Sequence, residues 1–325
     1  MQDTEAAGGK PIRLAVTLGD PRGIGPEVAH AATLAWRREV PDGAVIFIGP
    51  DSDTTTAPAD EYISVGSWES SQPISDAGAI AGRAIQKAVD LATSGAVDAI
   101  VTAPIDKAAL NAGGYHFPGH TEMLAELTAT PAVAMMMAAE STRLGGALRV
   151  VLATTHVALA SVPRLLTTEL LVEQARLTRD ALRKLWRIRT PRLALCAFNP
   201  HASDGGLFGD EEARIMTPAI ERLRADGIDI AGPLPADTVF VRSIGGESDA
   251  VIAPYHDVGM AAFKTAAFGQ GVNVTLGLPF IRTSPDHGTA IDIAGKGAAD
   301  PSSMLEAMRL ASRLASAGHA LVMTR

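Results

Sequence analysis

Strand-like and helix-like segments alternate along most of this 325-residue chain. Short runs rich in Val, Ile, Leu and Ala have the length of buried strands, and longer segments between them carry apolar residues at helical spacing. This alternation is typical of proteins in which helices cover a mostly parallel sheet, because parallel strands need long crossover connections. The sequence therefore predicts a layered α/β fold.

The same pattern places the expected elements. Strands are expected at 12–20, 43–49, 97–105, 132–140, 147–155, 192–198, 249–255 and 271–277. Helices are expected at 26–40, 76–95, 120–128, 167–186, 210–227 and 301–318. Residues 51–61 are expected to form a loop and residues 1–11 a flexible tail. Because no internal repeat or long Ser/Gly linker divides the chain, two lobes that share a continuous sheet are favoured over tethered domains.

Composition limits the partners and the compartment. A formal net charge of -8 and the absence of Lys/Arg runs argue against nucleic acid as a partner. No apolar stretch approaches the roughly 18 residues of a membrane helix, and the N-terminus lacks a secretion signal. Cys196 is the single cysteine, so an intrachain disulfide is excluded, as suits a reducing compartment. We therefore expect a cytoplasmic protein that binds no membrane.

Three histidines follow strand-like runs in similar contexts. His156, His201 and His256 each lie at or just beyond the carboxyl end of an expected strand, in a loop rich in Pro, Gly and Asp. That edge of an α/β sheet is where ligands bind. Three imidazoles hold a borderline metal and leave a coordination position for substrate. A structural role is the alternative for any one of them, and the threefold repeat favours the metal site.

Two Gly-rich loops are candidates for ligand binding. TLGDPRGIGPE (17–27) permits close backbone approach, but it is neither a dinucleotide fingerprint nor a P-loop, and a plain connection explains it as well. In 102–124, Lys107 supplies a positive charge, and His120 and Thr121 begin a helix. A helix N-terminus with a hydroxyl and an imidazole suits a phosphate or carboxylate, although simple capping is the alternative.

Two further segments differ in what they indicate. In 199–213, the acidic residues Asp210, Glu211 and Glu212 are explained by the helix dipole. In 255–297, cations and amides stand among Gly and Pro with few other charges, which favours a substrate pocket. The polar residues concerned are His256, Asp257, Lys264, Asn273, Arg282, Asp286 and His287.

Several motifs resemble one known family. GDPRGIGPE, VTAPIDKAALN, FPGHTE, NPHAS, DTVF, YHD and VNVTLGLPFIRTSPDHGTAIDIAG are similar, in this order over about residues 12–310, to the 4-hydroxythreonine-4-phosphate dehydrogenases of vitamin B6 biosynthesis. The resemblance implies a two-lobed α/β/α sandwich like that of isocitrate and isopropylmalate dehydrogenases, with the active site in the cleft between the lobes. It also implies a homodimer with the metal site near the interface. The lobes are expected at 12–140 plus 295–325, and at 141–294, which carries the dimer interface.

The resemblance also implies roles for individual residues. His156, His201 and His256 would hold one divalent metal, with ligands drawn from both subunits; nitrogen ligands favour zinc, cobalt or nickel, with magnesium or manganese as alternatives. The implied substrate contacts are His120, Thr121, Lys264, Asn273 and Arg282. NAD or NADP would bind without the Rossmann fingerprint, on a side lined by Asp237, Leu278, Asp286 and His287.

The implied reaction is the NAD(P)-linked oxidation of 4-phosphooxy-L-threonine, with loss of CO2, to 3-amino-2-oxopropyl phosphate. Lys264 would act as general base or as an electrostatic stabiliser, with Lys107 as an alternative base. Asp257 would support His256 or provide an oxygen ligand, unless it only bonds its own loop.

One departure bears on the substrate. Many members of the family read YHDQG where this chain reads YHDVG, so Val258 cannot make the hydrogen bonds of that glutamine. If the glutamine contacts ligand, the substrate differs, and D-threonate or D-erythronate 4-phosphate is the alternative. The retained GHTE, Lys264 and Arg282 favour a phosphorylated substrate over a terephthalate-derived dihydrodiol. An inactive binding module is a further alternative, disfavoured because no expected ligand is missing.

Overall fold

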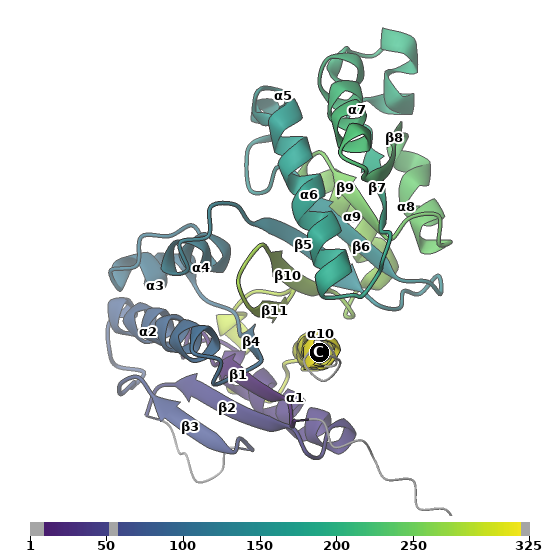
Figure 1. The fold of residues 1–325 in the computed structure, drawn as a ribbon. Helices are drawn as coiled ribbons and strands as arrows, with labels where there is room; N and C mark the ends of the chain where they lie inside the picture. The colour runs from purple at the N-terminus through teal and green to yellow at the C-terminus, as the bar shows by residue number, and fades with distance from the viewer. Residues whose placement is uncertain (1–9, 52–57, 320–325) are drawn as a thin grey trace, which may run out of the picture.

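The computed structural model describes residues 10–51 and 58–319, with the side chains of 318 and 319 excepted. Within these residues eleven strands form one mixed sheet, in the order β3-β2-β1-β4-β11-β10-β5-β6-β9-β7-β8, and helices lie against it (Figure 1). The strands are β1 (Arg13–Thr17), β2 (Ala44–Gly49), β3 (Glu61–Ser64), β4 (Ala99–Thr102), β5 (Ala134–Ala139), β6 (Leu148–Leu152), β7 (Arg192–Cys196), β8 (Asp229–Leu234), β9 (Ala250–Ala253), β10 (Val272–Leu276) and β11 (Ile281–Pro285).

The helices occupy most of the connections between strands. They are α1 (Gly25–Glu39), α2 (Ile74–Thr93), α3 (Lys107–Ala112), α4 (His120–Leu127), α5 (Val162–Leu165), α6 (Thr168–Lys184), α7 (Thr217–Ala225), α8 (Ala236–Ile244), α9 (His256–Ala267) and α10 (Ser302–His319). Strands β1–β4 with α1 and α2 lie in the lower half of Figure 1, and β6–β9 with α5–α8 lie in the upper half. None of these described helices combines the length and the apolar character needed to cross a membrane.

Strand direction fixes where the loops emerge. β1, β2, β3, β4 and β11 pair in parallel, and so do β6, β9, β7 and β8. β10 and β5 join the two sets through antiparallel pairs. The carboxyl ends of β6, β9 and β7 therefore lie at one edge of the sheet, and the chain leads from them to His156, His256 and His201, as predicted.

The predicted α/β fold is confirmed, and every predicted strand and helix is present with ends that differ by a few residues. The expected tail falls mostly on residues 1–9, which lie outside the described residues, as do 52–57 of the expected loop. The predicted helix 210–227 begins with a wide turn (η4, Glu212–Met216) before α7. Pro218 stands at the start of α7, where its missing N–H breaks the regular helical hydrogen-bond pattern. The division into lobes stays a prediction.

One predicted loop is wrong. His256 does not lie in a loop, because it is the first residue of α9. This helix was missed because its buried face is made largely of small residues, Gly259, Ala266 and Ala267 beside Phe263. A Cβ on Gly259 would lie 2.6 Å from a methyl carbon of Leu152, so glycine lets α9 approach β6 closely.

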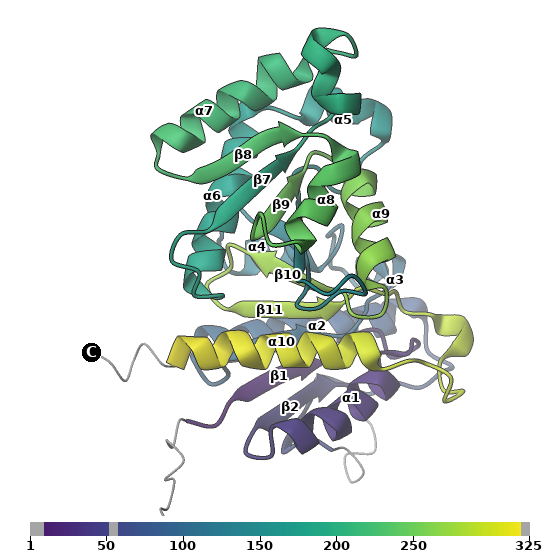
Figure 2. The ribbon, with the colours of Figure 1, turned by 90° about the vertical axis from the view of Figure 1, so that its right-hand side faces the viewer.

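A partly exposed acid, Glu140, ties α10 to the upper part of the sheet. α10 lies along β11 and packs against α1 (Figure 2). Directly after β5, the Glu140 carboxylate accepts hydrogen bonds from Arg149 at 2.8 Å and the Trp186 indole at 2.9 Å, and it pairs with Arg313 of α10 at 2.7 Å. Burial alone would raise the pKa of Glu140, but these donors outweigh it and lower the pKa to about 2.

We expect Glu140→Gln to lower the free energy of unfolding by about 1–3 kcal/mol at neutral pH, because two arginines lose their carboxylate partner. The folded-state pKa lies below its usual value of 4.5, so the carboxylate stabilises the fold above that pH. This contribution disappears as the pH falls from 4.5 towards 2. Denaturant titration at pH 7 and at about pH 4 measures the difference, which must shrink at the lower pH. Glu39→Gln, which breaks an exposed pair with Arg309, is the matched control and is expected to cost under about 1 kcal/mol.

Candidate active site

A cavity of about 520 Å³ lies over the central strands, between α4 and α6. It is lined by residues from the ends of β4, β6 and β11, from β10, and from the first turn of α4. Seven residues singled out from the sequence line it together: Lys107, His120, Thr121, His156, Asn273, Arg282 and His287. Four of the five candidate substrate residues, all but Lys264, therefore share one cavity with one candidate metal ligand.

Arg282 is the most deeply buried charge at this site. It is 2% exposed and donates from Nη1 to Thr275 Oγ1 at 3.0 Å and from Nη2 to Thr102 Oγ1 at 2.6 Å. Its Nε has no hydrogen-bond partner, and within the described residues no carboxylate forms an ion pair with it. Burial lowers the pKa of Arg282 to about 9, so the guanidinium is still charged at neutral pH. A buried cation held only by hydroxyls is suited to an incoming anion.

Two more polar atoms face the cavity without a partner. His120 is the first residue of α4, and its Nε2 is buried without a hydrogen bond, as is Asn273 Oδ1 on β10. Burial, and then the charges of Arg282 and Lys107, lower the pKa of His120 well below its usual value, so the ring is neutral. Buried polar atoms are normally paired. Their convergence here indicates a polar ligand.

The Lys264 side chain lies beside this cavity. Its Nζ lies 2.7 Å from Asp286 Oδ2 and donates to the Asp286 backbone carbonyl at 3.0 Å. The Asp286 side chain is 7% exposed and also accepts from Ser303 Oγ at 3.3 Å. Pro285 and His287, on either side of Asp286, line the cavity. The carboxylate of Asp286 thus holds Lys264 near the ligand space.

Two of the three candidate metal ligands come together. The rings of His156 and His256 have centroids 5.4 Å apart and are tilted by 48°. Two rings that share a zinc ion with Zn–N distances of about 2.1 Å have centroids about 5 Å apart, so the pair fits a metal. Burial, and then nearby cations, lower the pKa of His156, which keeps it in the neutral form that binds metal. His256 Nδ1 lies 2.7 Å from Asp257 Oδ1, which leaves Nε2 free for a ligand role.

His201 does not join this pair. Among the described residues, no group of three His, Cys, Asp or Glu side chains is placed to hold a metal. His201 is exposed in an irregular turn (η3, Pro200–Gly206) in which residues 201–205 all have left-handed backbone angles. Glu212 fixes the start of this turn by accepting from the Phe198 and Asn199 amides at 2.9 and 2.7 Å. Glu212 was predicted to act only through the helix dipole, and that interpretation is incomplete.

Two expected cofactor residues lie away from the cavity. Asp237 is exposed in the first turn of α8 and lines none of the described cavities. Leu278 is 8% exposed, belongs to the core cluster of Met123 and Leu124, and borders a different cavity.

Several polar residues of the cavity were missed from the sequence, among them Glu122, Gln174 and Ser284. Gln174 was detectable, because it stands on the buried face of α6 among Leu171, Ala175 and Thr178, where a polar side chain is unusual. Its Oε1 is buried without a partner. Glu122 belongs to the same GHTE motif as His120.

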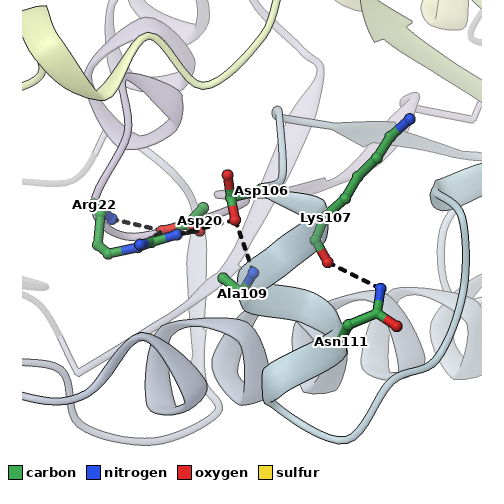
Figure 3. Close-up of polar contacts among 6 residues, drawn as sticks. All are labelled: Asp20, Arg22, Asp106, Lys107, Ala109 and Asn111. Atoms are coloured by element: carbon green, nitrogen blue, oxygen red, sulfur yellow. Dashed lines mark hydrogen bonds and ion pairs between the residues drawn. The ribbon is translucent and has the colours of Figure 1, made fainter.

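The loop 17–27 connects to the site through an ion cluster (Figure 3). Arg22 Nη2 lies 2.7 Å from the buried Asp20 carboxylate and 3.4 Å from Asp106 Oδ1. Asp106 Oδ1 also caps α3 by accepting from the Ala109 amide at 2.7 Å. The loop itself borders a second cavity of about 540 Å³ and does not line the first. Its role there is indirect, since Asp106 directly precedes Lys107.

Comparison with known proteins agrees with this geometry. The family model described as pyridoxal phosphate biosynthetic protein PdxA matches residues 28–311. The chain belongs to the PdxA family. A 4-hydroxythreonine-4-phosphate dehydrogenase of Geobacter metallireducens is 44% identical over 93% of this chain and 95% of its own. A Bradyrhizobium diazoefficiens protein named "Putative D-threonate 4-phosphate dehydrogenase" is 42% identical over 94% of this chain and 98% of its own.

Solved structures confirm the fold predicted for a PdxA protein. The crystal structure of 4-hydroxythreonine-4-phosphate dehydrogenase from Klebsiella pneumoniae matches with a TM-score of 0.81 and 36% identity, over 94% of this chain and all of that one. Isocitrate dehydrogenase from Methylococcus capsulatus, at 16% identity and a TM-score of 0.51, shares the fold alone. Membership of this dehydrogenase family implies a nicotinamide cofactor and a divalent metal.

Proposed function

We propose that this protein oxidises 4-phosphooxy-L-threonine with NAD or NADP in vitamin B6 biosynthesis. The substrate loses a hydride to the nicotinamide and CO2 from its carboxyl group, giving 3-amino-2-oxopropyl phosphate, CO2 and NAD(P)H. The observation that carries the proposal is the cavity in which buried polar atoms without hydrogen-bond partners lie together with His156, whose ring neighbours that of His256. One end suits an anion and the other suits a metal.

His156 and His256 are proposed to hold the divalent metal, with zinc the best match to imidazole nitrogen. When bound, a divalent metal supplies Lewis acidity towards a substrate hydroxyl. Asp257 fixes the ring of His256 through Nδ1 and so presents Nε2. His120 and Asn273 orient the substrate by hydrogen bonds from inside the cavity.

We propose an electrostatic role for Lys264 rather than proton abstraction. Its ammonium group lies 2.7 Å from the Asp286 carboxylate, which suits a fixed positive charge beside the substrate. Of the four proposed cofactor residues, His287 is the one that lines the cavity in the described part of the chain. We therefore propose that His287 would contact the nicotinamide, which supplies the hydride acceptor when bound.

A homodimer completes the proposed metal site. His201 is exposed and is held apart from the His156–His256 pair, and Leu207 and Phe208 beside it are 72% and 46% exposed. A second copy that covers these apolar side chains would bring its own His201 towards the pair. Sedimentation of the protein in solution tests the dimer, and a monomer that retains full activity contradicts it.

The position of Val258 gives little reason to expect a substrate other than 4-phosphooxy-L-threonine. Val258 is half-buried, packs on the core cluster beneath α9, and lines neither the main cavity nor the small one beside His256. The name of the Bradyrhizobium relative keeps D-threonate 4-phosphate as the second candidate substrate.

The deciding experiment is a substrate panel. We expect the protein to reduce NAD or NADP with 4-phosphooxy-L-threonine, at a kcat/KM at least tenfold above those with D-threonate 4-phosphate and D-erythronate 4-phosphate. Absorbance of the reduced nicotinamide measures the rate, and product analysis for CO2 confirms decarboxylation. Turnover of the sugar acid phosphates alone would reject the B6 assignment, and no turnover of any would reject the dehydrogenase.

A further inference from the structure

Lys107 brings a second cation into the main cavity. It is the first residue of α3, and its side chain points away from the Asp20–Arg22–Asp106 cluster (Figure 3). Its Cε lies 3.9 Å from the position that a Cβ on Gly119 would take, so the side chain passes over the start of α4. No carboxylate forms an ion pair with it anywhere in residues 10–51 and 58–319.

The backbone around Lys107 is fixed by its neighbours. Asp106 caps α3 and is paired with Arg22, and Asn111 Nδ2 donates to the Lys107 carbonyl at 3.0 Å. The side chain therefore leaves the helix from a fixed point although Lys107 is exposed. Such an arrangement keeps the flexible ammonium group of Lys107 at the main cavity, where it can bind a ligand.

The charges around the start of α4 do not balance. Lys107 and Arg282 both line the cavity together with His120, and the charges of both act on its ring. Glu122 is the acid that faces them, with Oε2 3.5 Å from the same Gly119 position. One carboxylate against two cations and a neutral imidazole leaves net positive charge. The first turn of α4 adds free backbone N–H groups, because its N-cap residue, Gly119, has no side chain to accept hydrogen bonds from them.

We propose that Lys107 is a phosphate-binding residue, and that its ammonium group acts with Arg282 and the first turn of α4 on the phosphate ester of the substrate. A phosphate monoester carries up to two negative charges and several acceptor oxygens, which matches two cations and a set of N–H donors better than a single carboxylate does. This inference rests on the proposed function for the identity of the substrate, but not for the anion site. It gives Lys107 a binding role and not that of a base.

Kinetics of Lys107→Met test this. We expect the KM for the phosphorylated substrate to rise about 10- to 100-fold, as for loss of one charged hydrogen bond, with kcat changed less than about threefold. Lys107→Arg, which keeps the charge, is expected to recover most of the affinity. Lys184→Met, at the exposed end of α6, is the matched control and is expected to leave both parameters unchanged. A fall in kcat at constant KM that Lys107→Arg does not rescue would show that Lys107 acts as a base, and would overturn the proposal.

Binding of inorganic phosphate to the full-length protein gives a readout independent of turnover. Calorimetry is expected to show an affinity for Lys107→Met at least tenfold below that of the wild type and of Lys184→Met. Equal phosphate affinity for all three proteins would overturn the proposal even if the enzyme turns over its substrate. Conversely, weaker phosphate binding by Lys107→Met with no turnover by the wild type would uphold the anion site and reject the proposed function.

Discussion

Replacing His256 by alanine is expected to remove the bound divalent metal and to lower kcat/KM by about 10³-fold or more. The imidazole of His256 lies beside that of His156, with ring centroids 5.4 Å apart, and the described residues offer no set of three metal-binding side chains in place of this pair. Lewis-acid assistance is worth several kcal/mol of transition-state stabilisation, and each 1.4 kcal/mol is about a factor of ten in rate.

Metal analysis of the purified variant, together with cofactor-reduction rates, measures both effects. Asp257→Asn keeps the ligand but weakens its support through Nδ1, so we expect 10- to 100-fold weaker metal binding with residual turnover at saturating metal. His116→Ala, at an exposed histidine outside the cavity, is the control that should match the wild type. A His256→Ala protein with a full equivalent of metal and normal rates would remove the metal site from the mechanism.

The sequence predicted the parts of the fold whose apolar signal is strong. Long helices with a periodic buried face, such as α6, and strands of uninterrupted aliphatic residues, such as β9, were placed within a few residues. β11 was missed because Arg282, Thr283 and Ser284 stand where a buried strand normally carries apolar residues. Those polar residues serve the cavity, so local sequence and structure disagree at the site itself.

The sequence predicted many of the residues of the candidate site, but not how they are arranged in space. Motifs placed His156, His201 and His256 after strands that do end at one edge, but loop direction decides which rings meet. The left-handed turn at His201 carries no signal beyond its glycines, so its separation from the pair could not be foreseen. Pairing between distant residues, such as Lys264 with Asp286, is likewise a product of tertiary packing.

Arg282→Met is expected to lower kcat/KM by about 10²- to 10³-fold without destabilising the fold. The guanidinium is buried with no carboxylate in an ion pair among the described residues, so the free protein carries a desolvation cost that the substrate anion would offset. Methionine removes that cost and fills similar space. Loss of the two hydrogen bonds from Arg282 to Thr102 and Thr275 lowers the free energy of unfolding by about 1 kcal/mol each. We expect a free energy of unfolding equal to that of the wild type or up to about 2 kcal/mol higher.

Denaturant titration, steady-state kinetics and the effect of phosphate on thermal stability measure these terms separately. Phosphate is expected to raise the Tm of the wild type more than that of Arg282→Met, since it binds the folded site. The pKa of Arg282 is lowered from 12.5 to about 9, so the wild type should gain stability relative to the variant as the pH rises from 9 towards 12.5.

Arg149→Met is the matched control for this prediction, because Arg149 is 9% exposed but paired with Glu140. It should lose stability, since Glu140 loses one of its two arginine partners, and keep activity, since Arg149 does not line the cavity. Opposite outcomes for the two arginines would show that Arg282 is retained for its ligand and not for the fold. Equal destabilisation by both substitutions would contradict that conclusion and make Arg282 a structural residue.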